Sequence, residues 1–110
     1  MNPSDSIKTI RLSGELEIGR KDEIREALRR SPGDRAILVD LSDVTYADSV
    51  ALTELLRFCV ASSRDAIPVA LVVRTPQFAR VVEYAGLAAA FKIFSDSDAA
   101  LTYLGQASAT

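Results

Sequence analysis

The chain has 110 residues, of which 48% are hydrophobic and 25% charged, with one cysteine and no histidine. This composition predicts one globular domain over residues 1–110 and excludes a disulfide framework, Ser-His-Asp or Cys-His catalysis and the usual zinc sites. The net charge is −2, from 13 basic and 15 acidic residues without a basic stripe. Nucleic-acid binding is therefore disfavoured, and we expect a protein partner.

The N-terminal residues MNPSDS contain no apolar segment, and the apolar runs further along the chain are only a few residues long. The sequence therefore predicts neither a signal peptide nor a membrane span. We expect a cytoplasmic protein.

The first elements read as a hairpin followed by a helix. Residues 7–12 alternate between apolar and polar side chains, as in an edge strand, and such an edge is compatible with a monomer or a weak dimer. Ser13-Gly14 predicts a turn, after which residues 15–18 form a short strand that pairs with the first. Residues 20–30 have helical character.

Two continuous aliphatic runs, at residues 36–39 and 69–73, predict central strands that are covered by helices on both faces. A helix is expected from about Ser49 to Ser63, and Cys59 on its buried face reads as an inert thiol. The side chains that face the core are Leu52, Leu55, Leu56 and Cys59. The side chains on the opposite, exposed face are Val50, Thr53, Glu54, Arg57 and Ala61.

Thr75-Pro76 begins the next predicted helix, and Gly86 ends it. A short strand at residues 91–94 leads through SDSD, at residues 95–98, into a final helix that reaches about Leu104. The order β-β-α-β-α-β-α-β-α predicts an α/β fold, with a mixed, mostly parallel sheet of four to five strands and about four helices packed on it.

The junction Asp48-Ser49 joins the first central strand to the following helix. Asp48 is predicted to cap the helix by accepting main-chain N–H groups near Val50 and Ala51, which contributes about 0.5–2 kcal/mol. A serine at a helix N-terminus is a place where an added phosphate can lie or be recognised. On the residues alone, a plain capping pair is the alternative interpretation.

Three motifs along the chain resemble those of the STAS domain family, the family of sulfate transporter and anti-sigma factor antagonist domains. Residues 12–17 read LSGELE and resemble the family's L-x-G-E-L-D. Residues 40–49 read DLSDVTYADS and resemble its D-L-x-x-V-x-x-x-D-S. Residues 83–87 read EYAGL and, followed by FKIF at residues 91–94, resemble the later helix end and strand. The resemblance implies the STAS fold over nearly the whole chain.

In the small antagonists of this family, the serine after the aspartate is phosphorylated by an anti-sigma factor that is itself a kinase. The resemblance therefore implies that Ser49 is the phosphoacceptor, that the protein is a kinase substrate and not an enzyme, and that it needs no cofactor. The family usually continues D-S-[S/T]-G-L, whereas this chain has Val50 and Ala51. Val50 removes a second hydroxyl, and Ala51 adds a methyl group where a partner could approach closely.

The expected partner surface surrounds the start of this helix. Phosphate on Ser49 would add charge and bulk there and block docking. Glu15 and Glu17 are expected to lie beside the helix and to meet basic residues of the partner, with ordinary surface charge as the alternative. Glu54 and Arg57 are expected to extend the contact surface along the helix, with a solvated i,i+3 pair as the alternative. The predicted partner-binding residues are Glu15, Glu17, Asp48, Ser49, Val50, Ala51, Thr53, Glu54 and Arg57.

Two other functions are compatible with parts of the sequence. A phosphotransfer site would use Asp40, Asp43 and Asp48 to hold Mg²⁺, although these residues read more simply as strand-end, turn and cap residues. Within the family, small STAS proteins also serve as cytoplasmic subunits that dock on the ATPase of phospholipid ABC transporters. The positions of Val50 and Ala51 make such constitutive docking a second candidate function, and stressosome-type scaffolding is a third.

Overall fold

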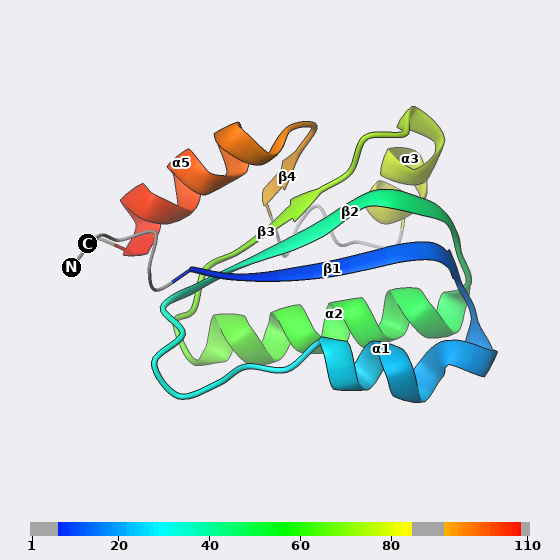
Figure 1. Cartoon of the computed structure of the whole chain (residues 1–110), viewed down its shortest axis with the longest axis horizontal. Coiled ribbons are helices and arrows are strands. Elements are labelled where there is room, and N and C mark those ends of the chain that lie inside the picture. Colours follow the sequence, from blue (N-terminus) through cyan, green and yellow to red (C-terminus); the bar gives the residue numbers. More distant parts are fainter. Residues whose placement is uncertain (1–6, 85–91, 109–110) are drawn as a thin grey trace.

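The structure is a computed structural model that describes residues 7–84 and 92–108. Within these ranges, four strands form one sheet in the order β1-β2-β3-β4, and all neighbouring strands are parallel. Helices follow the strands along the chain, because parallel strands need crossover connections (Figure 1). The strands are β1 (Ile7–Leu16), β2 (Ala36–Ala47), β3 (Val69–Val72) and β4 (Lys92–Phe94).

Helices cover both faces of the sheet, which confirms the predicted α/β class. α1 and α2 lie together along one face, and α5 packs on the other face (Figure 1). The predicted helix stop at Gly86 and the residue Phe91 lie outside the described residues. The helical elements are η2 (Ile18–Arg20), α1 (Lys21–Ala27), α2 (Ser49–Arg64), α3 (Pro76–Tyr84) and α5 (Ser97–Ser108). None of the helices in the described ranges combines the length and apolar character needed to cross a membrane.

The aliphatic run of β2 contributes to two apolar clusters, because successive side chains of a strand point to opposite faces. Ile37 and Val39 join the cluster that contains α1 and α2. Ala36 and Leu38 join the cluster beneath α5, which includes Leu104. The prediction that residues 36–39 form a strand covered on both faces is confirmed.

The predicted hairpin at the N-terminus is wrong. β1 runs without a turn from Ile7 to Leu16 and pairs in parallel with β2, so residues 15–16 continue the first strand. Gly14, read as part of a turn, lies inside the strand with a φ of +75°. The pairing register shifts on both sides of this glycine, which is how a strand absorbs a residue in the left-handed region.

Candidate docking site at the start of α2

Asp48 joins three elements through its main chain and its carboxylate. It is the N-cap of α2, and its Oδ1 accepts a hydrogen bond from the N–H of Ala51 at 2.9 Å, as predicted for a cap. Its Oδ2 accepts a second bond, also of 2.9 Å, from the N–H of Ile18 at the start of η2. Its own N–H donates to the carbonyl of Leu16 at the end of β1. The start of α2 is therefore fixed to the end of β1 and to η2.

Ser49 is the first residue of α2, and it is exposed to solvent. Thr53, one turn further along, is also exposed, and its hydroxyl donates to the Ser49 carbonyl at 2.7 Å. Val50 is half-buried. The side chain of Ala51 is fully buried in the core, so the methyl group expected to face a partner points into the protein instead.

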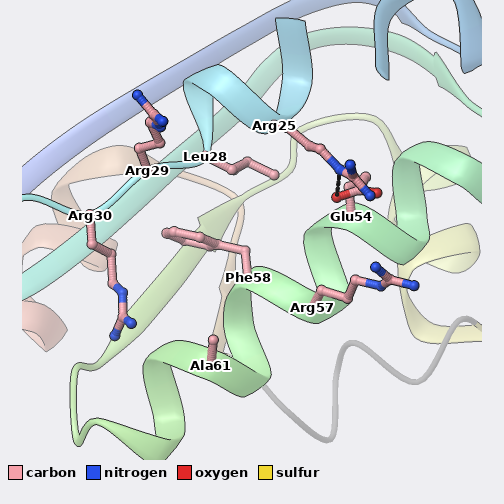
Figure 2. A pocket seen from close by; sticks show the side chains of 8 residues that line it. All are labelled: Arg25, Leu28, Arg29, Arg30, Glu54, Arg57, Phe58 and Ala61. Carbon is pink, nitrogen blue, oxygen red and sulfur yellow. Dashed lines mark ion pairs between the residues drawn. The ribbon is translucent and has the colours of Figure 1, made fainter. Parts of the chain in front are cut away.

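The helical spacing predicts that Glu54 lies on the exposed face of α2, and this prediction is wrong. Only 8% of the residue is exposed, and its Oε2 lies 3.1 Å from Nε of Arg25 in α1 (Figure 2). The hydrogen bond from Arg25 lowers the pKa of Glu54, and the charges of Arg25, Arg57 and Lys21 add to this effect against the opposing effect of burial. Glu54 thus joins α1 to α2, whereas Arg57 is exposed, as predicted.

Glu15 lies at the end of β1, and Glu17 directly precedes η2, in the segment that is joined to Asp48 by hydrogen bonds of Leu16 and Ile18. Glu15 is exposed and stands opposite Tyr46 in the pairing of β1 with β2. Glu17 is the N-cap of η2, and its carboxylate accepts the N–H of Gly19 at 3.0 Å. The structure therefore brings both residues to the end of β1 beside Asp48, and Glu17 has a capping function in addition to its charge.

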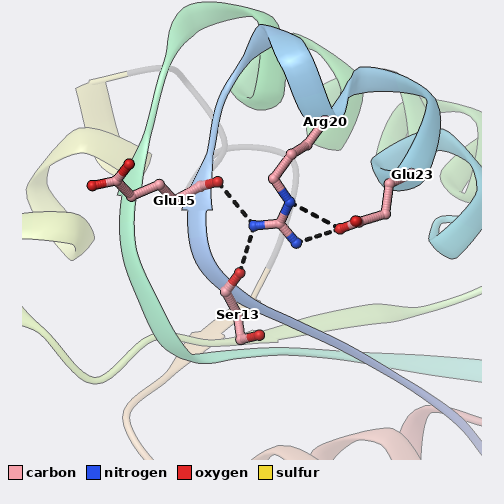
Figure 3. Close-up of polar contacts among 4 residues, drawn as sticks. All are labelled: Ser13, Glu15, Arg20 and Glu23. Atoms are coloured by element: carbon pink, nitrogen blue, oxygen red, sulfur yellow. Dashed lines mark hydrogen bonds and ion pairs between the residues drawn. The ribbon is translucent and has the colours of Figure 1, made fainter.

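Arg20 holds this bordering segment in place (Figure 3). Its Nη1 donates to the carbonyl oxygens of Ser13 at 2.7 Å and Glu15 at 2.9 Å, on either side of Gly14. Its Nε donates to Glu23 at 2.9 Å, and its Nη2 also contacts that carboxylate. The guanidinium thus satisfies carbonyls at the irregular end of β1 and ties them to α1.

Three residues that sequence reasoning missed also surround the junction. Ile18 and Tyr46 are large hydrophobic residues that are 64% and 53% exposed. Tyr46 lies two residues before Asp48, and the N–H of Ile18 donates to the Asp48 carboxylate. Lys21, the first residue of α1, lines a hollow with Ser49. The sequence predicts a strand at Ile18, and nothing in the local pattern near Lys21 or Tyr46 indicates what lies beside them in the fold.

The hollow beside Ser49 has a volume of about 190 Å³. One face of α2 forms most of it, and the start of α1 closes one side. Ser49 therefore shares a surface depression with two cations and one carboxylate. The lining residues are Lys21, Ser49, Val50, Thr53, Glu54 and Arg57.

Two of the three candidate aspartates for a Mg²⁺ site have other partners, and the third, Asp43, is exposed in β2. Asp40 accepts hydrogen bonds from the main chain and hydroxyl of Ser42 and pairs with Arg11 at 3.7 Å. Both carboxylate oxygens of Asp48 accept main-chain N–H groups. Among the described residues, no group of three or more acidic, cysteine or histidine side chains could hold a metal ion.

Cys59 lies in the core on the inner face of α2, where the sequence placed it. Only 1% of the residue is exposed, and burial raises the pKa of its thiol. A thiol in such surroundings remains protonated and is a poor nucleophile. The prediction of a buried thiol at this position is confirmed.

Known structures share this fold. A sulfate transporter family protein from Wolinella succinogenes has a TM-score of 0.83 at 16% identity, over 96% of this chain and 89% of that one. A proposed anti-sigma factor antagonist from Thermotoga maritima has a TM-score of 0.80 at 23% identity, over 91% and 88%. An anti-sigma factor antagonist from Mycobacterium paratuberculosis has a TM-score of 0.73 at 25% identity, over 91% and 86%.

No curated protein matches the chain by sequence. The model of the STAS domain family matches residues 1–100, which include β1, the Asp48-Ser49 junction and all of α2. Since this match spans most of the chain, the chain belongs to the STAS domain family.

Proposed function

We propose that this protein is an anti-sigma factor antagonist. It binds an anti-sigma factor that is also a serine kinase, this binding releases the sigma factor, and phosphorylation of Ser49 prevents it. In this role the protein works in the cytoplasm as a binding partner and kinase substrate, not as an enzyme. The observation that carries the proposal is the fixed start of α2, which leaves Ser49 exposed beside a hollow in a STAS domain.

The geometry of the junction suits a protein partner. The carboxylate of Asp48 ties α2 to η2, so Ser49 is presented on a rigid surface. The exposed apolar side chains of Ile18 and Tyr46 offer area for burial in an interface, and aromatic residues are enriched at the centres of such interfaces. Similarity at 25% identity to a structure described as an anti-sigma factor antagonist supports the same role.

Phosphorylation would change this surface at one atom. The kinase transfers the γ-phosphoryl group of ATP to Ser49 Oγ: the new P–O bond forms there, the bond to the bridging oxygen of ADP breaks, and the hydroxyl proton goes to the general base of the kinase. The product carries a charge of about −1.5 to −2 at the centre of the proposed interface. A desolvated charge at that place opposes docking.

The binding test compares four forms of the full chain against the anti-sigma kinase, by isothermal titration calorimetry. Wild type and Ser49→Ala should bind alike. Ser49→Asp should bind at least about tenfold more weakly, a difference of about 1.4 kcal/mol. Ser63→Asp adds the same charge at an exposed position near the other end of α2 and should bind as wild type. Equal affinity of Ser49→Asp and wild type would contradict the switch.

The phosphorylation test uses the kinase with ATP and intact-mass measurement. Wild type and Ser63→Ala should each gain one phosphoryl group, and Ser49→Ala should gain none. A phosphoryl group on the Ser49→Ala chain would assign the modification to another residue.

Docking on the ATPase of a phospholipid ABC transporter is the second candidate. Val50, which is half-buried, stands where the phosphorylated members usually have a hydroxyl residue, and the buried Ala51 stands where they have glycine. Both replacements favour docking without a switch. Similarity to a sulfate transporter family protein shows only that the two proteins share a fold. Capture of the native partner separates the candidates, since a small ATP-binding kinase supports the first and a transporter ATPase supports the second.

A further inference from the structure

The surface between α1 and α2 contains two hollows that share Glu54 and Arg57. The larger one has a volume of about 450 Å³, with an apolar floor that includes Leu28 and Phe58 (Figure 2). The smaller one is the hollow of about 190 Å³ beside Ser49. Five cationic side chains line the two hollows: Lys21, Arg25, Arg29, Arg30 and Arg57.

Three of these cations have carboxylate partners. Arg25 pairs with Glu54 at 3.1 Å, Arg29 with Glu26 at 2.9 Å, and Arg30 with Asp65 at 2.5 Å. In the described part of the chain, Lys21 and Arg57 form no ion pair. These two are also the cations that line the hollow beside Ser49. Of these five cations, the two without an ion pair therefore both line the hollow that contains the candidate phosphoacceptor, where their charges also act on the Glu54 carboxylate.

The spacing along α2 directs Arg57 towards this hollow. Ser49, Thr53 and Arg57 follow one another at intervals of four residues and therefore lie on one side of the helix. Side chains of a helix lean towards its N-terminus, and Figure 2 shows Arg57 extending on the side of Glu54, away from Ala61. Lys21 approaches from the start of α1, on the opposite side of the same hollow.

We propose that Lys21 and Arg57 bind the phosphate of phosphorylated Ser49 within the same chain. The inference rests on the proposed function, because it requires a phosphate at Ser49. The phosphate would occupy the hollow, take the two cations as charge-assisted hydrogen-bond donors and connect α1 to the start of α2. Arg57, predicted to contact the partner, would then be engaged within the chain, so phosphorylation would remove a partner contact as well as add charge.

The test installs phosphoserine at position 49 of the full chain during translation, so that no kinase is needed. Phosphorus NMR then follows the second ionisation of the phosphate, whose ordinary pKa is about 6. A nearby positive charge favours the dianion and lowers this pKa. Lys21→Met and Arg57→Met should each raise it by at least about 0.3 units relative to the parent phosphoprotein.

Other charged groups at the hollow are unchanged between these proteins. Glu54 lines the hollow, Arg25 is paired with Glu54, and Asp48 directly precedes Ser49 in the chain. Arg64→Met is the matched control, because it removes the same charge from the same helix at a distance of about 22 Å along the axis from Ser49. Screening at physiological salt acts over about 8 Å, so this variant should leave the phosphate pKa unchanged.

The conservative variants Lys21→Arg and Arg57→Lys should keep the parent pKa, since each retains the cation. Arg57 is exposed and Lys21 is half-buried, so we expect every variant to fold, which circular dichroism checks. If Lys21→Met and Arg57→Met give the same pKa as Arg64→Met, intramolecular binding of the phosphate is overturned. That result is independent of the kinase and partner measurements, which test the proposed function.

Discussion

Asp48 is the residue on which the geometry of the site depends. A capping aspartate ordinarily satisfies N–H groups of its own helix, and here only Oδ1 does so, through Ala51. Oδ2 instead accepts the N–H of Ile18 in η2, 30 residues earlier in the chain. One carboxylate therefore sets both the start of α2 and the position of the exposed Ile18 beside it.

Replacing Asp48 should cost more than the loss of an ordinary cap. We expect Asp48→Ala to lower the free energy of unfolding by about 2–3 kcal/mol, since it removes the cap of α2 and the acceptor for Ile18. Asp48→Asn should lose less, because asparagine also caps helices well. Urea unfolding monitored by circular dichroism measures both changes.

Asp96→Ala is the matched control for this prediction. Asp96 also accepts two main-chain N–H groups, from Asp98 at 2.7 Å and Ala99 at 3.1 Å, but both belong to α5 itself. Its loss should cost about 1 kcal/mol. Equal losses in Asp48→Ala and Asp96→Ala would show that the bond to Ile18 contributes nothing.

At the scale of elements, the packing of α1 on α2 buries Glu54, which was expected to be exposed, in an ion pair with Arg25. Glu54 is almost fully buried, whereas about half of the Arg25 side chain, 49%, remains exposed. A buried carboxylate is tolerated only when it is paired. Removal of the two partners should therefore differ in its cost to stability. Removing Arg25 leaves the buried carboxylate without a counter-charge, whereas removing the charge of Glu54 leaves an exposed cation that water can solvate.

This inequality gives a prediction for two single variants. At neutral pH, Arg25→Met should lower the free energy of unfolding more than Glu54→Gln does, because in Glu54→Gln the amide oxygen can still accept from Arg25. Arg29→Met, which breaks an exposed pair with Glu26, should change it by less than about 1 kcal/mol. A loss in Arg29→Met as large as that in Arg25→Met would contradict the role of burial.

The same pair has a defined pH dependence. Because the pKa of Glu54 is lowered in the folded protein from its ordinary value of 4.5, the folded state holds this proton less tightly than the unfolded chain does. The stabilisation is therefore fully present above pH 4.5 and is lost as the pH falls through the lowered pKa. The advantage of wild type over Glu54→Gln in urea unfolding should shrink over that acidic range, and a constant difference there would contradict it.

Helix periodicity placed most of α2 correctly, and it failed at Glu54 for a physical reason. The pattern within one helix identifies the stripe that faces the sheet, but α1 covers a second side of α2 that this pattern does not encode. The N-terminal strand failed for a related reason. Gly14 is a strong local turn signal, yet pairing with β2 and the hydrogen bonds from Arg20 keep the chain extended through it.

The site was predictable to the extent that it is local. The capping role of Asp48 and the exposure of Ser49 follow from a strand-to-helix junction, and both are present. The contributions of Ile18, Tyr46 and Lys21 come from pairing and packing between distant segments, which a single sequence does not specify.

At the scale of the molecule, the two faces of the sheet have separate cores. Leu55 of α2 and Leu104 of α5 are both fully buried, but they belong to different apolar clusters on opposite faces. The central strands β2 and β3 separate these clusters. A substitution in the apolar cluster beneath α5 is therefore remote from the start of α2, although both clusters contribute to global stability.

A pair of leucine variants tests this separation. Leu55→Ala and Leu104→Ala should each lower the free energy of unfolding by about 2–5 kcal/mol. Under conditions in which circular dichroism shows both variants folded, Leu104→Ala should bind the partner within about twofold of wild type, as expected for distant sites. Leu55→Ala should bind more weakly. Equal weakening by both would indicate that the two faces are coupled.

The hydrogen bonds of the Asp48 carboxylate also make the complete junction a property of the folded chain. The carboxylate bonds an N–H group 30 positions earlier in the chain, so this contact requires the end of β1 to lie against the end of β2. A fragment or partly folded chain that contains α2 alone lacks the complete junction. A partner that recognises the junction would thus select fully folded copies, and its binding would in turn protect those copies from unfolding by mass action.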